Sequence, residues 1–219
     1  GLQHQDGHSH ILANTIPNCV SYDPCFGYEL AVIVHDGLQR MYVNQERVFY
    51  YLTLMNENYE HPEMPQGVEE GIKRGMYLLQ EDEKATVQLL GSGVILREVI
   101  KAAKILREEY QIHSNVYSVT SFNELARDGM ACEEYNRLHP LAAESKEPWV
   151  SQQLRGKDGI VVSATDHMRA YSEQIRGYLP DSRPFVALGT DGYGRSDTRG
   201  NLRSYFGVDA AHIVVATLK

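Results

Sequence analysis

The chain has 219 residues, a net charge of −8 from 29 acidic and 21 basic residues, and a hydrophobic content of 42%. This composition is typical of a soluble globular protein with a real core, and the scattered basic residues argue against a nucleic-acid partner. The longest apolar runs are too short to cross a bilayer, and the first residues do not resemble a secretory signal. Three cysteines without CxxC spacing argue against a disulfide framework, so we expect a cytoplasmic protein.

The first 55 residues alternate between helical and extended patterns. The expected elements are a loop over 1–6, a short helix over 8–15, a strand over 19–22, a helix over 27–41 and a strand over 47–54. The last of these is rich in β-branched and aromatic residues, which predicts a buried strand. The alternation favours a parallel sheet covered by helices, although this stretch holds too few strands for a complete sheet.

Residues 56–84 carry several prolines, glycines and acidic residues, which predicts an interdomain connection with little regular structure at its start. The alternation resumes over 85–219 as a second unit. There we expect strands over 86–90, 115–120, 159–164 and 184–188, with helices ending near 110 and spanning 124–138 and 167–179. The predicted fold class is α/β, with a mostly parallel sheet in the second unit.

Several short stretches carry a family resemblance. Residues 1–4, followed after a short helix by Ile16-Pro17-Asn18, resemble the pyrimidine-binding domain of the transketolase superfamily of thiamine enzymes, and 75–80 resembles the start of the C-terminal domain. Within that superfamily, 1–10, 55–59 and 188–197 are similar to the single-chain, homodimeric pyruvate dehydrogenases. The resemblance covers nearly the whole chain.

The resemblance implies an organisation and an activity. Residues 1–55 would be the C-terminal part of a thiamine pyrimidine-binding α/β domain, 56–84 the interdomain linker, and 85–219 a transketolase-like C-terminal α/β domain. The activity would be oxidative decarboxylation of pyruvate, with transfer of the acetyl unit to the lipoyl group of the dihydrolipoamide acetyltransferase. Thiamine diphosphate and Mg²⁺ would be the cofactors of a homodimer. The resemblance places their ligands upstream of Gly1, so the chain alone is expected to be inactive.

Two alternatives remain open. The chain could serve only as an assembly or dimerisation module, because the C-terminal domain of this family carries no cofactor ligands. It could also belong to another thiamine enzyme, such as a transketolase or a branched-chain keto acid dehydrogenase. Transketolases place an Arg soon after the last strand of the pyrimidine-binding domain, whereas Leu54–Tyr59 contains neither Arg nor Lys. A small keto acid needs no such phosphate contact, so pyruvate is favoured.

His4 is the principal candidate for catalysis and substrate binding. The resemblance places it on the substrate side of the cofactor, where an imidazole could hydrogen-bond a carboxylate or a developing oxyanion. Glu57 and Tyr59, with His61, follow a predicted strand and are weaker candidates for lining the mouth of the active site. His4, Asp6, His8 and His10 have the residue types of a metal cluster. The resemblance includes no metal there, so we expect no metal ligand in this chain.

The glycine-rich loops are expected to be structural. Gly91-Ser92-Gly93 lacks the rest of a phosphate-binding fingerprint and predicts a tight strand-to-helix turn. In the loop over 189–197, Asp191, Arg195 and Asp197 are expected to fix the loop and a helix start, or to meet another subunit. Large aromatic residues are expected in the core or an interface, and the cysteines have no neighbouring base that would make them nucleophiles. These residues are Tyr22, Tyr28, Tyr50, Tyr51, Trp149, Cys19, Cys25 and Cys132.

Overall fold

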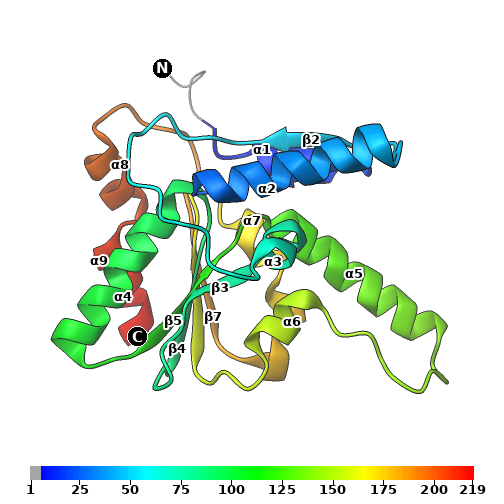
Figure 1. Cartoon of the computed structure of the whole chain (residues 1–219). Helices are drawn as coiled ribbons and strands as arrows, with labels where there is room; N and C mark the ends of the chain where they lie inside the picture. Colours follow the sequence, from blue (N-terminus) through cyan, green and yellow to red (C-terminus); the bar gives the residue numbers. More distant parts are fainter. Residues whose placement is uncertain (1–5) are drawn as a thin grey trace.

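The computed structural model describes residues 6–219, apart from the side chain of Ser182 (Figure 1). Two sheets organise this part of the chain: a two-stranded sheet near the N-terminus and a five-stranded sheet that follows it. The α/β class with a mostly parallel sheet is confirmed. No helix within residues 6–219 is both long enough and apolar enough to cross a membrane.

The N-terminal unit contains two helices and two strands, followed along the chain by a long irregular segment. Its elements are α1 (Ser9–Asn14), β1 (Cys19–Tyr22), α2 (Gly27–Leu38), the π-helical turn η2 (Gln39–Val43) and β2 (Phe49–Leu52). β1 and β2 are parallel, with Cys19 opposite Phe49 and Tyr22 opposite Leu52. Every residue of β1 is buried, because the apolar face of α2 and the second unit cover it.

β2 differs from its prediction. It was expected to be a buried strand, but this prediction is wrong: Phe49 is 44% exposed and the other three residues of the strand are half-buried. The reason is positional, because within the described residues β2 pairs only with β1 and its other edge has no partner strand. The β-branched and aromatic residues of 47–54 therefore predicted a strand correctly, but they do not show which other elements pack against it.

The second unit is built on the strand order β3-β5-β4-β6-β7, in which only β3 runs antiparallel. Its strands are β3 (Tyr77–Gln80), β4 (Val87–Gly91), β5 (Ser114–Ser118), β6 (Ile160–Ala164) and β7 (Phe185–Leu188). Its longer helices are α3 (Glu69–Arg74), α4 (Leu96–Tyr110), α5 (Phe122–Leu138), α6 (Trp149–Leu154), α8 (Arg199–Phe206) and α9 (Ala210–Leu218). Shorter turns are η3 (Gly93–Ile95), α7 (Ala170–Glu173), η4 (Arg176–Tyr178) and η5 (Pro180–Ser182).

Helices cover both faces of this sheet, as Figure 1 shows. Leu89 packs under α4 and α9, and its neighbour Leu90 packs on the opposite face against α5, α6 and α7. This alternation follows from the two-residue period of a strand. Both faces are apolar because a parallel sheet is buried on both sides.

Two further predictions need correction. The connection predicted over 56–84 is irregular only in its first part, because its second half folds into α3 and β3. The helix predicted over 167–179 is reduced to α7 and the turn η4. Its first residues are used elsewhere: His167 is buried beside Asp23, and the backbone N–H of Met168 donates to the carbonyl oxygen of Gly7.

A buried carboxylate joins the two units. Glu29, in the first turn of α2, is fully buried and accepts four hydrogen bonds. Its Oε2 accepts from the backbone N–H groups of Cys25 at 2.6 Å and Phe26 at 2.9 Å, while Oε1 accepts from the hydroxyl groups of Tyr77 at 2.7 Å and Ser118 at 2.5 Å. The same side chain therefore caps α2 and ties it to β3 and β5.

Candidate functional site

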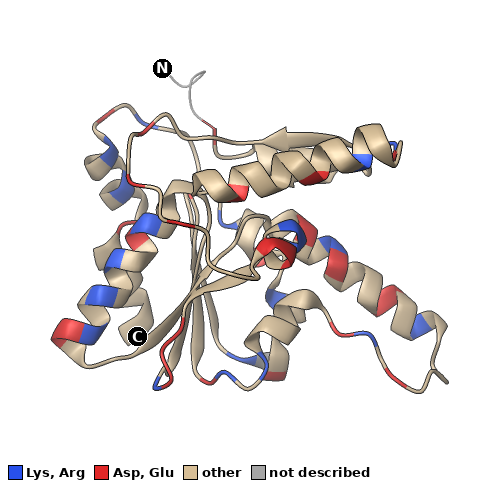
Figure 2. Cartoon of the chain, viewed as in Figure 1, with Lys and Arg blue, Asp and Glu red and all other residues tan. Residues whose placement is uncertain are grey.

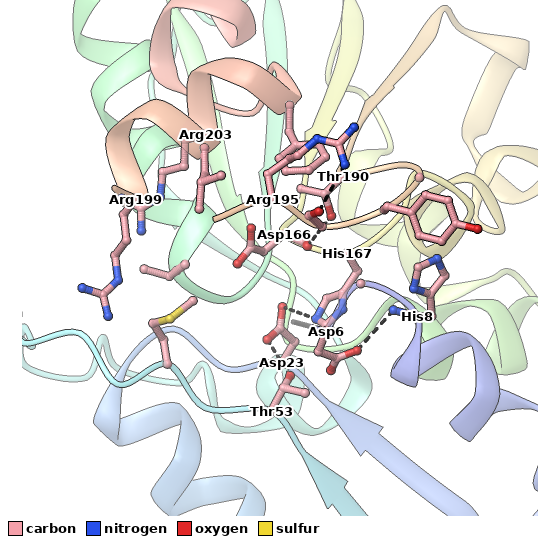
Figure 3. Close-up of a pocket in the computed structure, with 18 of the residues that line it drawn as sticks. Asp6, His8, Asp23, Thr53, Asp166, His167, Thr190, Arg195, Arg199 and Arg203 are labelled. Carbon is pink, nitrogen blue, oxygen red and sulfur yellow. Dashed lines mark hydrogen bonds and ion pairs between the residues drawn. The ribbon is translucent and has the colours of Figure 1, made fainter. Parts of the chain in front are cut away.

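A cavity of about 560 Å³ lies where the carboxyl ends of the strands from both sheets meet. Such strand ends are where α/β proteins commonly bind ligands. Its floor comes from the loops after β1, β2, β4 and β6, and α8 forms one wall (Figure 3). The lining residues with functional groups are Asp6, His8, Asp23, Thr53, Asp166, His167, Thr190, Tyr193, Arg195, Arg199 and Arg203.

Asp23 is the central polar group of the floor. The residue is 7% exposed, and its carboxylate accepts hydrogen bonds from Thr53 Oγ1 at 2.7 Å and Ser92 Oγ at 3.0 Å. Its backbone carbonyl accepts from the N–H of Gly93 at 2.9 Å. Gly93 has φ of +50°, and an added Cβ would lie 2.5 Å from the Asp23 carboxylate. The Gly91-Ser92-Gly93 turn is thus a structural turn that holds Asp23 in place.

His167 forms a buried ion pair with Asp23, with 3.6 Å between His167 Nε2 and Asp23 Oδ2. Burial is the largest single influence on Asp23 and raises its pKa, but the charge and hydrogen bond of His167, with contributions from His10 and Thr53, together lower the pKa of Asp23 to about 2. Burial opposes the charged form of His167, yet the nearby Asp23 carboxylate raises the pKa of His167 above its ordinary value. Each of the two groups therefore favours the charged form of the other.

His10 lies against the same pair. It is fully buried in α1, its Nε2 is 2.8 Å from Thr53 Oγ1, and its ring centroid is 4.6 Å from that of His167. Burial lowers the pKa of His10 to about 4, and the charge of His167 adds to this shift. His10 is consequently neutral where His167 is charged.

The wall of the cavity formed by α8 is basic. Figure 2 shows basic positions along α8, and Arg199 and Arg203 face the cavity from one side of that helix. Arg203 donates to Glu57 at 2.8 Å and lies 3.4 Å from Glu98, while Arg199 donates to Asn56 Oδ1 at 2.9 Å. Across from them, Asp166 is half-buried, and its removal from water raises the pKa of its carboxyl group. The cavity thus presents both charge signs.

The segment before α1 closes one side of the cavity. Asp6 caps α1 by accepting hydrogen bonds from the backbone N–H groups of His8 at 3.2 Å and Ser9 at 3.0 Å. Gly7 is fixed by the N–H of Met168, whose nitrogen lies 2.9 Å from the Gly7 carbonyl oxygen. His8 is exposed and lines the cavity. His4, the principal predicted site residue, lies outside the described residues.

The weaker candidates have structural partners. Glu57 binds Arg97 at 2.8 Å as well as Arg203, and the hydroxyl of Tyr59 donates to the carbonyl of Cys25 at 2.5 Å. His61 accepts a hydrogen bond from the N–H of Gly27 at 2.9 Å. None of these three side chains is among the described residues that line the cavity. Glu57 acts on the cavity indirectly, by holding Arg203.

The loop over 189–197 has the structural contacts expected of it. Asp191 accepts from the backbone N–H of Arg169 at 2.9 Å, and Asp197 accepts from Thr198 N at 2.6 Å and Asn201 Nδ2 at 2.8 Å at the start of α8. Arg195, in contrast, lines the cavity.

The sequence analysis did not identify five residues of the cavity: Asp23, Asp166, His167, Arg199 and Arg203. The available signal was position, because Asp23, Asp166 and His167 each follow the end of a strand.

Comparison with known proteins assigns this arrangement to a family. Residues 75–209, more than half of the chain, match the family described as transketolase-like TK C-terminal domain. The chain belongs to the transketolase-like C-terminal domain family. Residues 1–62 match a second family, the pyruvate dehydrogenase E1 component middle domain. Solved transketolases have the same fold as this chain. The transketolase from Campylobacter jejuni superposes with a TM-score of 0.70 and 18% sequence identity, and the match covers 100% of this chain and 29% of that protein. For the transketolase from Leishmania mexicana the TM-score is 0.69 and the identity 19%, and the match covers 100% of this chain and 27% of that protein.

Curated relatives are more similar in sequence. The pyruvate dehydrogenase E1 components of Escherichia coli (strain K12) and Pseudomonas aeruginosa are 56% and 55% identical to this chain over its full length. That of Cupriavidus necator is 52% identical. The chain spans about a quarter of the length of these relatives, at 24%, 25% and 25% respectively. These identities confirm the predicted resemblance to bacterial pyruvate dehydrogenases.

Proposed function

We propose that this chain is part of the decarboxylase component of a pyruvate dehydrogenase complex. The component would oxidatively decarboxylate pyruvate and pass the acetyl unit to the lipoyl group of the dihydrolipoamide acetyltransferase. The observation that carries the proposal is the identity of 51% to 56% to bacterial pyruvate dehydrogenase E1 components along the whole chain. The chain alone spans too little of these relatives to be active by itself.

The walls of the cavity support pyruvate over a sugar phosphate. After β2 the lining is Thr53, which donates to Asp23 at 2.7 Å, followed by the exposed apolar side chains of Leu54 and Met55. The arginines of α8 lie on the other wall, and Arg203 is already bound by Glu57 and Glu98. The segment Leu54–Tyr59 itself offers no Arg or Lys to a phosphoryl group, and the Arg199 side chain that reaches it from α8 already donates to Asn56 at 2.9 Å. A small keto acid has no such requirement.

The described residues do not fit Mg²⁺ and thiamine diphosphate. Mg²⁺ prefers six oxygen ligands in octahedral geometry. Among residues 6–219, the group of His, Cys, Asp and Glu side chains close enough to share an ion consists of two imidazoles and one carboxylate. We therefore place the ligands of Mg²⁺, and of the thiamine diphosphate bound with it, in the part of the relatives' length that this chain does not span.

His4 is the residue of this chain proposed to act on substrate. An imidazole with an ordinary pKa near 6.5 can donate a hydrogen bond to a carboxylate or to a developing oxyanion. The contact between Met168 and Gly7 supports this role, since it anchors the backbone three residues after His4 to the second unit. The proposed location of the enzyme is the cytoplasm.

A homodimer is the proposed assembly. Large apolar side chains of the N-terminal unit are exposed on each of the elements α1, α2, η2 and β2. They are Leu12, Val34, Leu38, Tyr42, Val43 and Phe49. An apolar face of this kind is usually covered in the assembled protein. The same observation supports the alternative in which this chain contributes only to assembly.

Substrate competition in the full-length enzyme tests the proposal. Purified enzyme with thiamine diphosphate, Mg²⁺ and a lipoyl domain should acetylate that domain from pyruvate. A branched-chain keto acid and a phosphorylated ketose donor, each at equal concentration, should react far more slowly. Preferred use of either competitor would refute the substrate assignment. Normal turnover after all cavity-lining residues of this chain are neutralised would instead favour the assembly role.

A further inference from the structure

Three side chains that can ligate a metal meet at the floor of the cavity. They come from separate segments: His10 from α1, Asp23 from the end of β1 and His167 from the end of β6. One ligand atom from each lies within 4.8 Å of the other two. The three residues are 0%, 7% and 4% exposed, so none of them is a solvated surface group.

Neighbouring groups hold these side chains in place. Thr53 Oγ1 lies 2.8 Å from His10 Nε2 and donates to the Asp23 carboxylate at 2.7 Å, and Ser92 adds a second hydrogen bond to that carboxylate at 3.0 Å. Tyr171 stacks on His10, with 4.8 Å between ring centroids. Metal ligands in proteins are commonly oriented by a surrounding layer of hydrogen bonds of this type.

The two imidazoles also carry unused nitrogen atoms. The Nδ1 atoms of His10 and His167 are buried, and neither has a hydrogen-bond partner within the described residues. Buried polar atoms are satisfied in the great majority of cases, so each exception calls for a reason. The ion pair between His167 and Asp23 accounts for Nε2 of His167 and leaves both Nδ1 atoms without a partner.

We infer that His10, Asp23 and His167 form a binding site for a transition-metal ion of the Zn²⁺ type. Two imidazole nitrogens and one carboxylate oxygen are a common ligand set for Zn²⁺ and leave a fourth position for water or a ligand. Asp23 and His167 line the cavity, so that fourth position faces it.

The inferred site differs from the cluster of His4, Asp6, His8 and His10, which has the residue types of a metal site in the sequence. It also differs from the prediction that this chain contains no metal ligand. The Asp6 carboxylate caps α1 and His8 is exposed. His10 is the residue common to both sets, so variants of His8 and His167 separate them.

Metal titration of the full-length protein, with thiamine diphosphate and Mg²⁺ supplied in excess, tests the inference. Chelator-treated protein should bind one Zn²⁺ per chain, and Co²⁺ should give the visible absorption of a four-coordinate ion. Loss of one of three protein ligands, in His10→Gln or His167→Gln, should weaken Zn²⁺ binding by more than about 100-fold, beyond the loss expected for an outer-layer partner. The midpoint of thermal unfolding should rise with Zn²⁺, because the ion joins both units.

Two histidine variants provide controls. His8→Gln removes an exposed imidazole that lines the same cavity, and His212→Gln removes an exposed imidazole paired with Asp209 at 2.7 Å. Both should bind Zn²⁺ as the unaltered protein does. X-ray absorption spectroscopy requires no variant to fold. The spectrum of the unaltered protein with Zn²⁺ should show two imidazole ligands on the ion. Fewer than two imidazoles, or equal losses in His8→Gln and His167→Gln, or no binding at micromolar Zn²⁺, would overturn the inference.

Discussion

Met168 donates its backbone N–H to the carbonyl oxygen of Gly7 across 2.9 Å, and this bond fastens the segment before α1 to the loop after β6. Thr190 lies beside it, with its side-chain oxygen 3.5 Å from where a Cβ on Gly7 would lie. The five-stranded sheet therefore sets the position of Gly7, which follows His4 by three residues in the sequence. Our predictions begin with His4.

Replacement of His4 should slow the full-length enzyme without unfolding it. If His4 stabilises charge that develops on the substrate, His4→Ala should lower kcat/KM for pyruvate by roughly 10²–10³-fold, the scale of one lost hydrogen-bond donor. His4→Asn should recover part of that loss if hydrogen bonding is the role, because an amide still donates. Steady-state kinetics measure both, and His8→Ala is the matched control. Near-normal turnover by His4→Ala would remove His4 from the site.

The isolated chain should not be an enzyme. We expect no tight binding of thiamine diphosphate and no decarboxylation of pyruvate by the 219-residue polypeptide. The reason is that its described residues offer no oxygen-rich set of ligands for Mg²⁺. Isothermal titration with cofactor and Mg²⁺ is the measurement, with the full-length enzyme as positive control. Micromolar affinity in the short polypeptide would contradict this account.

Hydrogen exchange should differ between the two sheets. Amides in the strands of 86–120 and 159–188 should exchange more slowly than those of 47–54 in the isolated chain. β4, β5 and β6 are covered by helices on both faces, whereas β2 has one unpaired edge within the described residues. Mass spectrometry of exchanged peptides measures this. Equal protection would show that something else covers β2.

Glu29→Gln should destabilise the chain and alter its pH dependence. An amide nitrogen in place of one carboxylate oxygen leaves two buried donors without acceptors, which should cost about 2–4 kcal/mol of unfolding free energy. Burial raises the pKa of Glu29, despite the hydrogen bonds from Ser118 and Phe26 that oppose it. The folded protein therefore holds this proton more tightly than the unfolded chain. Stability from Glu29 should be greatest below its unfolded pKa, near 4.3, and decline as pH rises through the folded value.

Denaturant unfolding at several pH values measures this effect. The slope attributable to Glu29 should be absent in Glu29→Gln, while Glu133→Gln, on the exposed side of α5, should retain it. A slope that persists in Glu29→Gln must come from other groups.

Gly93→Ala should be more damaging than Gly156→Ala. Both glycines have positive φ, +50° and +69°, so both substitutions carry the backbone strain of about 1–2 kcal/mol for an L-residue. Only at Gly93 does the added Cβ also collide with a carboxylate, that of Asp23 at 2.5 Å; at Gly156 nothing lies within 4 Å. Thermal unfolding of the two variants isolates the collision. Equal losses would mean that Asp23 moves freely, contrary to its hydrogen bonds.

The sequence predicted six of the described strands, β1, β2, β4, β5, β6 and β7, but it did not predict β3, α8 or the cavity. β1 and β6 are apolar runs bounded by turn residues, so their position follows from local pattern. The partnership of Asp23 with His167 depends on which strand ends meet across two sheets, and no local pattern carries that information. An apolar run such as Ile213–Ala216, in α9, has no periodicity that separates helix from strand. Exposure of β2 likewise depends on neighbours, not on its own residues.

β3 serves both halves of the chain. It completes the edge of the five-stranded sheet beside β5, and its Tyr77 hydroxyl reaches the Glu29 carboxylate of α2. A protein cut between residues 84 and 85 would strip that strand from β5 and open a row of backbone donors and acceptors to other molecules. Anyone dissecting this chain for crystallisation or for a binding assay should cut ahead of α3, where Pro65 and Gly67 already interrupt the regular structure.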